Sequence, residues 1–271
     1  MTRVMGVLNV TPDSFSDGGR WLDPEAAVAH GRAMAAEGAD IVDVGGESTR
    51  PGARPVPEEE ELRRVVPVVE ALARENIVVS IDSRKPAVAR AAVAAGASII
   101  NDVSASLWPV AAETGAAWVA MHMPADPEVM QQHARYVDVV AEVKSYLVER
   151  AETARRAGVE NLWIDPGIGF GKTPAHNLSL LRHLDELVDT GIPVLVGTSR
   201  KSFLGRLAAG ETGESAGPED RLEGTVATTT WAVTRGADVV RVHDVRPVSQ
   251  AIHLAEARPR PESDVAGVPA R

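Results

Sequence analysis

Eight short apolar runs recur along the chain, and each ends in, or leads directly into, polar residues. Their apolar residues are continuous rather than alternating, which is typical of strands covered on both faces in a parallel sheet. This recurrence constrains the fold more than any other feature of the sequence. The runs cover residues 4–9, 41–44, 77–82, 98–102, 118–122, 162–165, 193–197 and 239–243.

Segments with helical spacing separate these runs. Apolar residues recur every three or four positions in 58–75, 139–147 and 178–188. Glycines precede several runs, where the end of a helix often needs a left-handed residue: Gly38, Gly96, Gly158 and Gly236. Eight units over 271 residues give about 34 residues each, the size of a strand followed by a helix. We therefore predict an α/β fold, a single-domain (β/α)8 TIM barrel, in preference to an open doubly wound sheet.

The expected barrel spans residues 1–257, and the tail 258–271, rich in proline and charge, is expected to be disordered. No apolar run is long enough to span a membrane, and the N-terminus lacks the pattern of a signal peptide. The absence of cysteine excludes disulfides and thiolate metal sites, and it fits a cytoplasmic enzyme. A net charge of -10 argues against nucleic acid as the main partner.

The polar residues at the strand ends are expected to meet, because parallel strands all finish on one rim of a barrel, where active sites are built. Any one of them could instead be a helix cap. Carboxylates and amides at Asn9, Asp82, Asn101 and Asp165 would accept hydrogen bonds from a flat N–H edge, such as a pterin-like or guanine-like ring. Cations would suit phosphate or carboxylate: Arg50, Arg200, Lys201, Arg241 and His243. The residues alone therefore indicate a heteroaromatic ring that carries phosphate.

Other enzyme classes find little support in the motifs. The sequence has no nucleophile elbow, no HExxH and no P-loop, and GIGFGK at 167–172 is a weak match to a nucleotide-binding loop.

Several blocks, in order along the chain from Val4 to about Ala257, resemble dihydropteroate synthase of the folate pathway. The most specific are NVTPDSFSDGG at 9–19, DVGGESTRPGA at 43–53, DPGIGFGKT at 165–173 and GTSRKSFLG at 197–205. Shorter ones are SIDS at 80–83, NDVS at 101–104, MHM at 121–123 and RVHDV at 241–245.

The resemblance implies a (β/α)8 barrel, a homodimer and a transferase. The implied reaction condenses 6-hydroxymethyl-7,8-dihydropterin diphosphate with p-aminobenzoate, in the presence of Mg²⁺, to give 7,8-dihydropteroate and diphosphate. Sulfonamides compete with p-aminobenzoate in this family. The substrates are therefore small molecules, and no membrane or nucleic-acid partner is expected.

The resemblance also implies site residues. The pterin ring would be held by Asp82, Asn101, Asp165 and Lys201. The diphosphate would be held by Asn9, Arg50, Arg241 and His243, with Asn9 touching the metal. The p-aminobenzoate pocket would contain Phe15, Thr49, Pro51, Phe170 and Ser202, with Lys201 on its wall. The catalytic set would be Asp17, Arg50, Lys201, Arg241 and His243, with Asp17 near the reacting carbon.

The implied mechanism needs no protein nucleophile. The C–O bond breaks early once the charge of the diphosphate is neutralised, and the neutral arylamine attacks the pterin-stabilised cation. Two positions depart from the family pattern: Ser83 stands where Thr is common, and Ala105 where Gly often follows NDVS.

Scaffold roles and other functions remain as alternatives. Asp43 and Glu47 could be internal hydrogen-bond partners of the loop at 45–54, and Asp102 and Asp244 could cap helices. A non-catalytic paralogue that binds pterin, or a methyltetrahydrofolate-dependent corrinoid methyltransferase, would share part of the pattern.

Overall fold

The protein forms a barrel of eight parallel strands in the computed structural model, which describes residues 1–11, 24–48, 53, 55–209 and 215–257. The strands neighbour one another in the order β6-β5-β4-β3-β2-β1-β8-β7, and every pairing is parallel. The strands are β1 Arg3–Asn9, β2 Ile41–Gly45, β3 Val79–Asp82, β4 Ile99–Asp102, β5 Ala117–Met121, β6 Leu162–Asp165, β7 Leu195–Val196 and β8 Val239–Val242.

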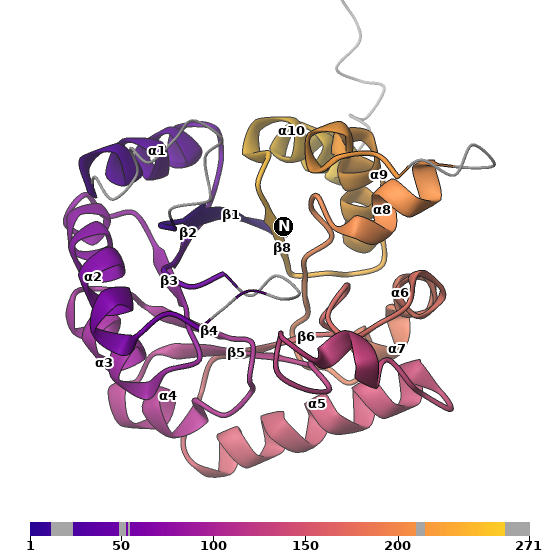
Figure 1. Ribbon diagram of the computed structural model, residues 1–271, viewed down its shortest axis with the longest axis horizontal. Coiled ribbons are helices and arrows are strands. Elements are labelled where there is room, and N and C mark those ends of the chain that lie inside the picture. Colours follow the sequence, from indigo (N-terminus) through magenta and orange to yellow (C-terminus); the bar gives the residue numbers. More distant parts are fainter. Residues whose placement is uncertain (12–23, 49–52, 54, 210–214, 258–271) are drawn as a thin grey trace, which may run out of the picture.

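Helices surround the strands in chain order, as Figure 1 shows. They are α1 Pro24–Ala36, α2 Glu58–Arg74, α3 Pro86–Ala94, α4 Trp108–Thr114, α5 Val139–Arg156, α6 Pro174–Arg182, α7 Asp185–Val188, α8 Ser202–Ala208, α9 Leu222–Thr234 and α10 Val245–Glu256. Two short 3-10 helices, η1 Met130–His133 and η3 Pro218–Asp220, lie in the long connections. This architecture confirms the predicted (β/α)8 barrel.

The seam between β6 and β7 is the weakest part of the closure. β7 has only two residues, and a single bridge joins Ile164 to Val194 across the seam. By comparison, β1 and β2 are paired over five residues.

Two apolar layers hold the barrel together. The larger cluster packs strand residues such as Leu8, Val44 and Ile81 against the helices. The smaller cluster draws one residue from each of seven strands, so it must fill the barrel interior: Met5, Ile41, Ile99, Val119, Trp163, Leu195 and Val239. We call these seven residues the barrel floor. Burying this apolar surface is the main favourable contribution to folding.

Local predictions agree with the structure except at a few boundaries. The glycines at 38, 96, 158 and 236 have positive φ values between 94° and 114°, as expected for helix ends. At Gly96 a Cβ would lie 2.6 Å from the Cβ of Ala73, so close approach adds to the conformational requirement. The pattern at 178–188 forms two helices, α6 and α7, rather than one, and the run at 193–197 forms only the short β7. The tail 258–271 lies outside the described residues.

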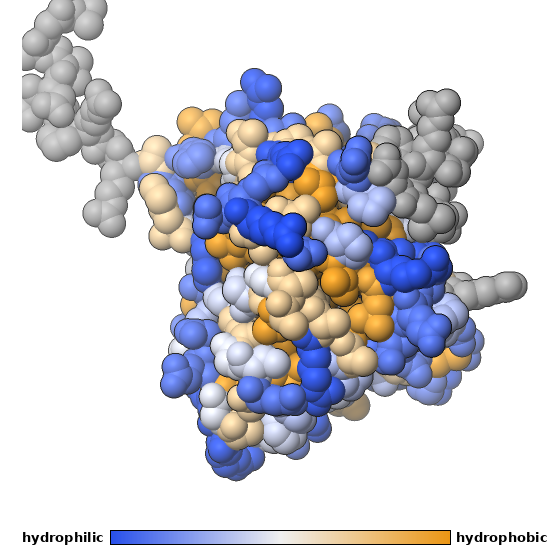
Figure 2. Space-filling view, turned by 90° about the vertical axis from the view of Figure 1, so that its left-hand side faces the viewer, coloured by the Kyte–Doolittle hydropathy of each residue, from blue (hydrophilic) through white to orange (hydrophobic). Residues whose placement is uncertain are grey.

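The outer face over the left-hand helices of Figure 1 mixes hydrophilic residues with smaller apolar groups, as Figure 2 shows. No helix in the described part of the chain is both long and apolar enough to cross a membrane.

Candidate active site

A polar layer lies directly above the barrel floor. Side chains two residues apart on a strand share one face, so the residue two positions after each floor residue also points into the barrel. Four of these positions carry polar or charged side chains, and each belongs to a different strand. They are Asp43 after Ile41, Asn101 after Ile99, Asp165 after Trp163 and Arg241 after Val239. Asp82 at the end of β3 joins them through Arg241. The rim predicted from the sequence is therefore a compact site.

Arg241 lies at the centre of this layer between two buried carboxylates. Its Nε donates to Asp43 Oδ2 and its Nη2 donates to Asp82 Oδ2, each at 2.6 Å. Asn101 Nδ2 donates to the same Asp43 oxygen at 2.9 Å. The second oxygens of Asp43 and Asp82 are buried and have no hydrogen-bond partner among the described residues. The site therefore offers open acceptors to a ligand that carries N–H groups.

Burial changes the proton affinities of these groups. It raises the pKa of Asp82 to about 7, although the Arg241 charge opposes this and Asp43 adds to it. Burial also raises the pKa of Asp165, against the charge of Lys201 and the N–H of Gly167. Against the effect of burial, Asp43 and Asp82 raise the pKa of Arg241, so it stays charged. Such perturbed groups gathered in one place are typical of functional sites.

Lys201 lies over the loop that follows β6. Its Nζ donates to the carbonyl of Ile168 and lies 4.7 Å from the ring centroid of Phe170. Burial lowers the pKa of Lys201 to about 8, while Asp165 opposes that shift. The structure thus brings together Asp165, Phe170 and Lys201, three of the predicted site residues.

The loop after β6 is shaped by a second, fully internal lysine. Lys172 Nζ lies 3.0 Å from His122 Nδ1 and donates to the carbonyls of Gly167 and Phe170, each also at 3.0 Å. Burial lowers the pKa of Lys172 to about 7 and that of His122 to about 3, so this histidine stays neutral. Gly167 has φ +64°, and a Cβ there would lie 2.0 Å from the His122 carbonyl oxygen, so no other residue fits. Lys172 and His122 therefore hold the loop that carries Phe170.

Ser199 and His243 lie together where β7 and β8 end. The His243 backbone N–H donates to Ser199 Oγ, and His243 Nδ1 lies 3.1 Å from the same oxygen. Arg200, expected from the sequence as a cation for an anion, instead makes a two-pronged pair with Asp244 at 3.0 and 2.6 Å. Asp244 is the N-cap residue of α10, in the predicted position, but its side chain makes no capping hydrogen bond.

Arg200 has a left-handed backbone with φ +57°. Its N–H donates to Thr225 Oγ1, and its carbonyl accepts from Arg221. These contacts fix the chain between Ser199 and Lys201.

Asn9 and Ser202 occupy the ends of their elements. Asn9 is the last residue of β1 and is partly buried, and the next residue donates from its backbone to Gly45 at 2.7 Å. Ser202 is the first residue of α8 and is exposed. Five predicted site residues lie outside the described part of the chain: Phe15, Asp17, Thr49, Arg50 and Pro51.

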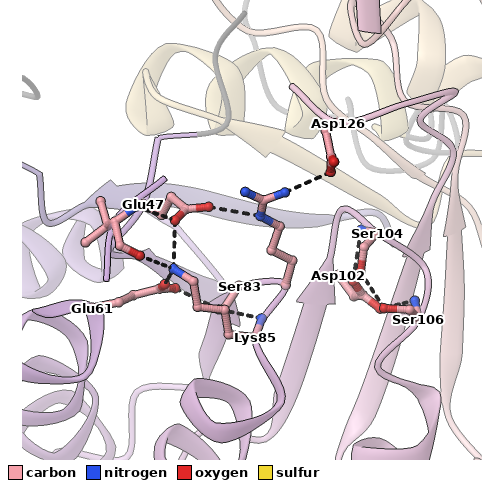
Figure 3. A network of polar contacts seen from close by, with 10 residues as sticks. Glu47, Glu61, Ser83, Lys85, Asp102, Ser104, Ser106 and Asp126 are labelled. Atoms are coloured by element: carbon pink, nitrogen blue, oxygen red, sulfur yellow. Dashed lines mark hydrogen bonds and ion pairs between the residues drawn. The ribbon is translucent and has the colours of Figure 1, made fainter. Parts of the chain in front are cut away.

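A network of ion pairs joins the loops after β2 and β3, as Figure 3 shows. Lys85 Nζ donates to both Glu47 and Glu61, and Ser83 Oγ donates to Glu61 at 2.7 Å. Glu47 Oε2 also accepts from the backbone N–H of Val56 at 2.8 Å. Glu47 therefore ties its loop to Val56 and Lys85, which both lie beyond residues 45–54. Its predicted role within that loop stays a prediction, because half of the loop lies outside the described residues.

Asp102 organises the loop after β4 (Figure 3). Its two oxygens accept from the backbone of Ser104, Ser106 and Leu107. Because α4 begins at Trp108, Asp102 holds the loop that leads into the helix rather than its first turn. Ala105 in this loop has φ +49°, which explains why glycine is favoured there.

Sequence reasoning missed the contacts that Asp43 makes with Asn101 and Arg241. Half of the loop at 45–54 lies outside the described residues, so a role of Asp43 toward that loop stays a prediction. The roles of Lys172 and His122 were also missed. The alternation within residues 41–44 was the available signal for Asp43, because Ile41 and Asp43 share one face while Val42 and Val44 share the other.

Asn9 is the residue implied to touch Mg²⁺. The described residues contain no group of three acidic or histidine side chains that could form a metal cage. Mg²⁺ commonly keeps several waters and binds through one or two protein oxygens together with substrate phosphates. The Asn9 Oδ1 atom lies 3.6 Å from the point where a Cβ on Gly45 would stand, so the glycine leaves space beside it. This arrangement fits a metal brought in with a phosphate substrate.

Comparisons with known proteins point to one family. The model of the pterin-binding enzymes matches residues 5–243. The dihydropteroate synthase of Mycobacterium leprae is 52% identical over 263 residues, covering 94% of this chain and 93% of that protein.

Two solved structures extend the similarity to three dimensions. A dihydropteroate synthase from Xanthomonas albilineans with 4-aminobenzoic acid aligns with a TM-score of 0.86 and 48% identity, covering 99% of this chain and 94% of that one. A Yersinia pestis dihydropteroate synthase in a sulfonamide drug complex aligns with a TM-score of 0.88 and 43% identity, covering 94% and 93%.

Proposed function

The chain belongs to the dihydropteroate synthase family of pterin-binding enzymes, and we propose that its barrel mouth carries out that reaction with the residues described above. The enzyme is a transferase that joins 6-hydroxymethyl-7,8-dihydropterin diphosphate to p-aminobenzoate and releases diphosphate. The observation that carries the assignment of the site is the buried Asp43–Arg241–Asp82 pairing with Asn101 beside it. It combines acceptors for a flat N–H edge with a cation for the charged tail.

The pterin ring is held by Asp82, Asn101, Asp165 and Lys201. Asp82 has a buried oxygen without a partner, and an N–H group of the ring would remove that cost. Asp165 is held in place by the N–H of Gly167, which donates to one of its oxygens at 2.7 Å. Carboxylates that accept from a planar N–H and NH₂ edge form two parallel hydrogen bonds, which give orientation as well as affinity.

The diphosphate is held by Asn9, Arg241 and His243, together with Arg50. Arg241 is anchored through Nε to Asp43 and through Nη2 to Asp82, so its positive charge is held at the site where an anion would bind. His243 is fixed by Ser199 at the end of β8, on the same rim. Positive groups on the leaving diphosphate lower the barrier, because its charge grows as the C–O bond breaks.

Mg²⁺ is the metal that fits this arrangement, with Asn9 as its protein ligand. When bound, Mg²⁺ would neutralise charge on the diphosphate. The chain itself contributes the amide oxygen of Asn9 and the space left by Gly45.

The p-aminobenzoate lies against Phe170 and Lys201, with its carboxylate at Ser202, where the N–H groups that open α8 face an anion. Phe15, Thr49 and Pro51 complete this pocket. A sulfonamide is expected to compete at the same place.

The reaction proceeds by early C–O cleavage. The pterin system stabilises the cation that forms, Asp17 and the departing diphosphate shield it, and the neutral arylamine attacks the exposed carbon. The amine then loses a proton. Asp17, Arg50, Lys201, Arg241 and His243 form the catalytic set, and no protein nucleophile takes part.

The protein acts as a cytoplasmic homodimer. The family resemblance supports the homodimer. The absence of cysteine from the sequence fits the cytoplasm. Light scattering coupled to size-exclusion chromatography measures the oligomer directly.

One assay tests the function. Purified protein is incubated with the pterin diphosphate, Mg²⁺ and p-aminobenzoate, and 7,8-dihydropteroate and diphosphate are measured. Equal amounts of both products above a mock-purified control support the transferase. Pterin binding without product would favour the non-catalytic paralogue instead.

A further inference from the structure

Asp43 is the most deeply buried charged group in the polar layer, with 0% exposure. One of its oxygens, Oδ2, accepts from both Arg241 Nε and Asn101 Nδ2, while Oδ1 accepts from no described residue. A buried carboxylate persists only where it is paired and hydrogen-bonded. Asp43 thus connects two proposed ligand residues from distant parts of the chain. Its Oδ1 is an open acceptor, but Asp43 is not among the four residues proposed above to hold the ring.

The contact with Asn101 fixes which way its amide faces. An ionised carboxylate accepts hydrogen bonds and cannot donate them, so the NH₂ group must be the arm that faces Asp43. The Oδ1 arm is then left on the other side of the planar amide. Asn101 consequently presents an acceptor to a ligand, in line with the acceptors of Asp82 and Asp165.

The contact between Asp43 and Arg241 holds the guanidinium group through Nε, the nitrogen nearest the backbone. Nε is held by Asp43, whereas Nη2 is held by Asp82. The ring is proposed to bind the other oxygen of Asp82, Oδ1, so it leaves both contacts of Arg241 in place. Arg241 therefore remains anchored beside the site when the ring binds.

Resting on the proposed function, we propose that Asp43 is a positioning residue for ring recognition: it sets the acceptor side of Asn101 toward the ligand and anchors Arg241 through Nε. Asp43 thereby makes the site selective for a ring with an N–H and NH₂ edge over one that carries carbonyl groups there. A site built to accept from such an edge rejects an analogue without it, because its buried acceptors would be left unpaired.

The test is Asp43→Asn, which keeps size and shape but gives residue 43 both a donor and an acceptor. The Asn101 amide can then adopt either orientation. Binding is measured by calorimetry with 6-hydroxymethylpterin and with 6-hydroxymethyl-lumazine, in which an oxo group replaces the 2-amino group. The wild type is expected to prefer the pterin, and the variant should lose at least about tenfold in pterin affinity and much of that preference.

Two further proteins separate positioning from general damage. Asp40→Asn is the matched control, because Asp40 is exposed, accepts from the Val4 N–H and precedes β2 at the opposite end of the barrel. It should bind both rings as the wild type does. In an Asn101→Ala background, Asp43→Asn should no longer change the preference between the two rings, because the amide that it orients is gone.

Two results would overturn the proposal. The first is an unchanged ring preference in Asp43→Asn, whether or not the affinity for both rings falls equally. The second is an effect of Asp43→Asn on ring preference that is as large in the Asn101→Ala background as in the wild type. If Asp43→Asn does not fold, Asp43→Ser gives the same comparison with a smaller polar side chain. Both ring ligands lack the diphosphate, so the binding result is independent of turnover. An inactive wild type that still prefers the pterin would reject the proposed function and keep this inference.

Discussion

At the scale of single residues, the ionisation of Asp82 links the structure to pH. The pKa of Asp82 is raised to about 7 by burial, with Asp43, Glu61 and Asp102 adding to the effect and Arg241 opposing it. Only the ionised carboxylate can accept two hydrogen bonds without donating one. Ring binding should therefore weaken as pH falls through 7.

We predict that the affinity for 6-hydroxymethylpterin rises roughly tenfold from pH 6 to pH 8, as expected for one group with this pKa. Calorimetry at several pH values measures the change, and Asp82→Asn should flatten it. A flat profile in the wild type would contradict the prediction. The stability of the fold should change with pH in the opposite direction to ring binding. The pKa of Asp82 is higher in the folded protein than in the unfolded chain, so the folded protein holds the proton more tightly. The contribution of Asp82 to the free energy of unfolding therefore falls as pH rises from about 4 to 7.

Arg241 carries a prediction of its own. In Arg241→Ala the diphosphate loses a cation, and Asp43 and Asp82 lose their shared partner. Removing one charge contact in a transition state typically costs about 3–4 kcal/mol, so kcat/KM should fall by at least roughly a hundredfold. Steady-state assays with varied pterin diphosphate measure the loss. An unchanged rate would exclude the proposed role of Arg241.

The residue scale also explains what sequence reasoning reached. Asp82 and Asp165 could be selected because each closes an apolar run, and Asn101 and Arg241 because each lies within two residues of a run's end, where the side chains of parallel strands converge. Asp43 also stands near the end of its run, and alternation along β2 places it on the same face as Ile41. Its contacts with Asn101 and Arg241 could not be predicted, because they depend on how distant strands face one another across the closed barrel. Lys172 could not be found in this way, since its partners are carbonyls whose positions depend on the turns at Gly167 and Gly171.

At the scale of elements, the loops on the rim are held by ion pairs between neighbouring units. Lys85 follows β3 and joins Glu47 after β2 to Glu61 on α2 (Figure 3). The side chain of Glu61 is 1% exposed, and Lys85 is its cationic partner. Breaking a buried pair is costly because the remaining charge stays buried without a partner.

We predict that Lys85→Met lowers the free energy of unfolding by about 3 kcal/mol. Urea denaturation followed by circular dichroism measures the change. Lys144→Met is the matched control, because Lys144 lies 3.8 Å from Glu186 with both side chains exposed, and it should cost less than about 0.5 kcal/mol. Similar losses in the two variants would show that the Lys85 network does not stabilise the rim.

Helix and strand boundaries show the limit of periodicity at this scale. Residues 178–188 keep helical spacing throughout, yet the chain breaks between α6 and α7 near His183. Both helices bury a leucine against the same core, Leu181 in α6 and Leu187 in α7. A pattern of buried positions survives such a break, so the sequence alone does not reveal it.

At the scale of the whole molecule, the proposed substrate site lies across the weakest seam of the barrel. Asp165 ends β6 and Lys201 follows β7. Among the described residues, the only pairing between these two strands is the bridge from Ile164 to Val194. The hydrogen bond from Lys201 to the carbonyl of Ile168 is a further link across this seam. A ring that contacts both Asp165 and Lys201 would add another link across the seam. The eightfold repeat predicted the barrel, but it could not show where the barrel closes least firmly.

We predict that 6-hydroxymethylpterin slows amide hydrogen exchange in β7 more than in β5, which carries no proposed ligand residue. Binding stabilises the folded state everywhere by mass action, so the comparison between the two strands isolates the local effect. Mass spectrometry of exchanged peptides measures both strands in one sample. In Lys201→Met the ring loses its contact on the β7 side. The extra slowing of amide exchange in β7 relative to β5 should then disappear. The slowing shared by both strands should remain, in proportion to the amount of ring bound. Equal slowing of β5 and β7 in the wild type would mean that the ring does not bridge the seam.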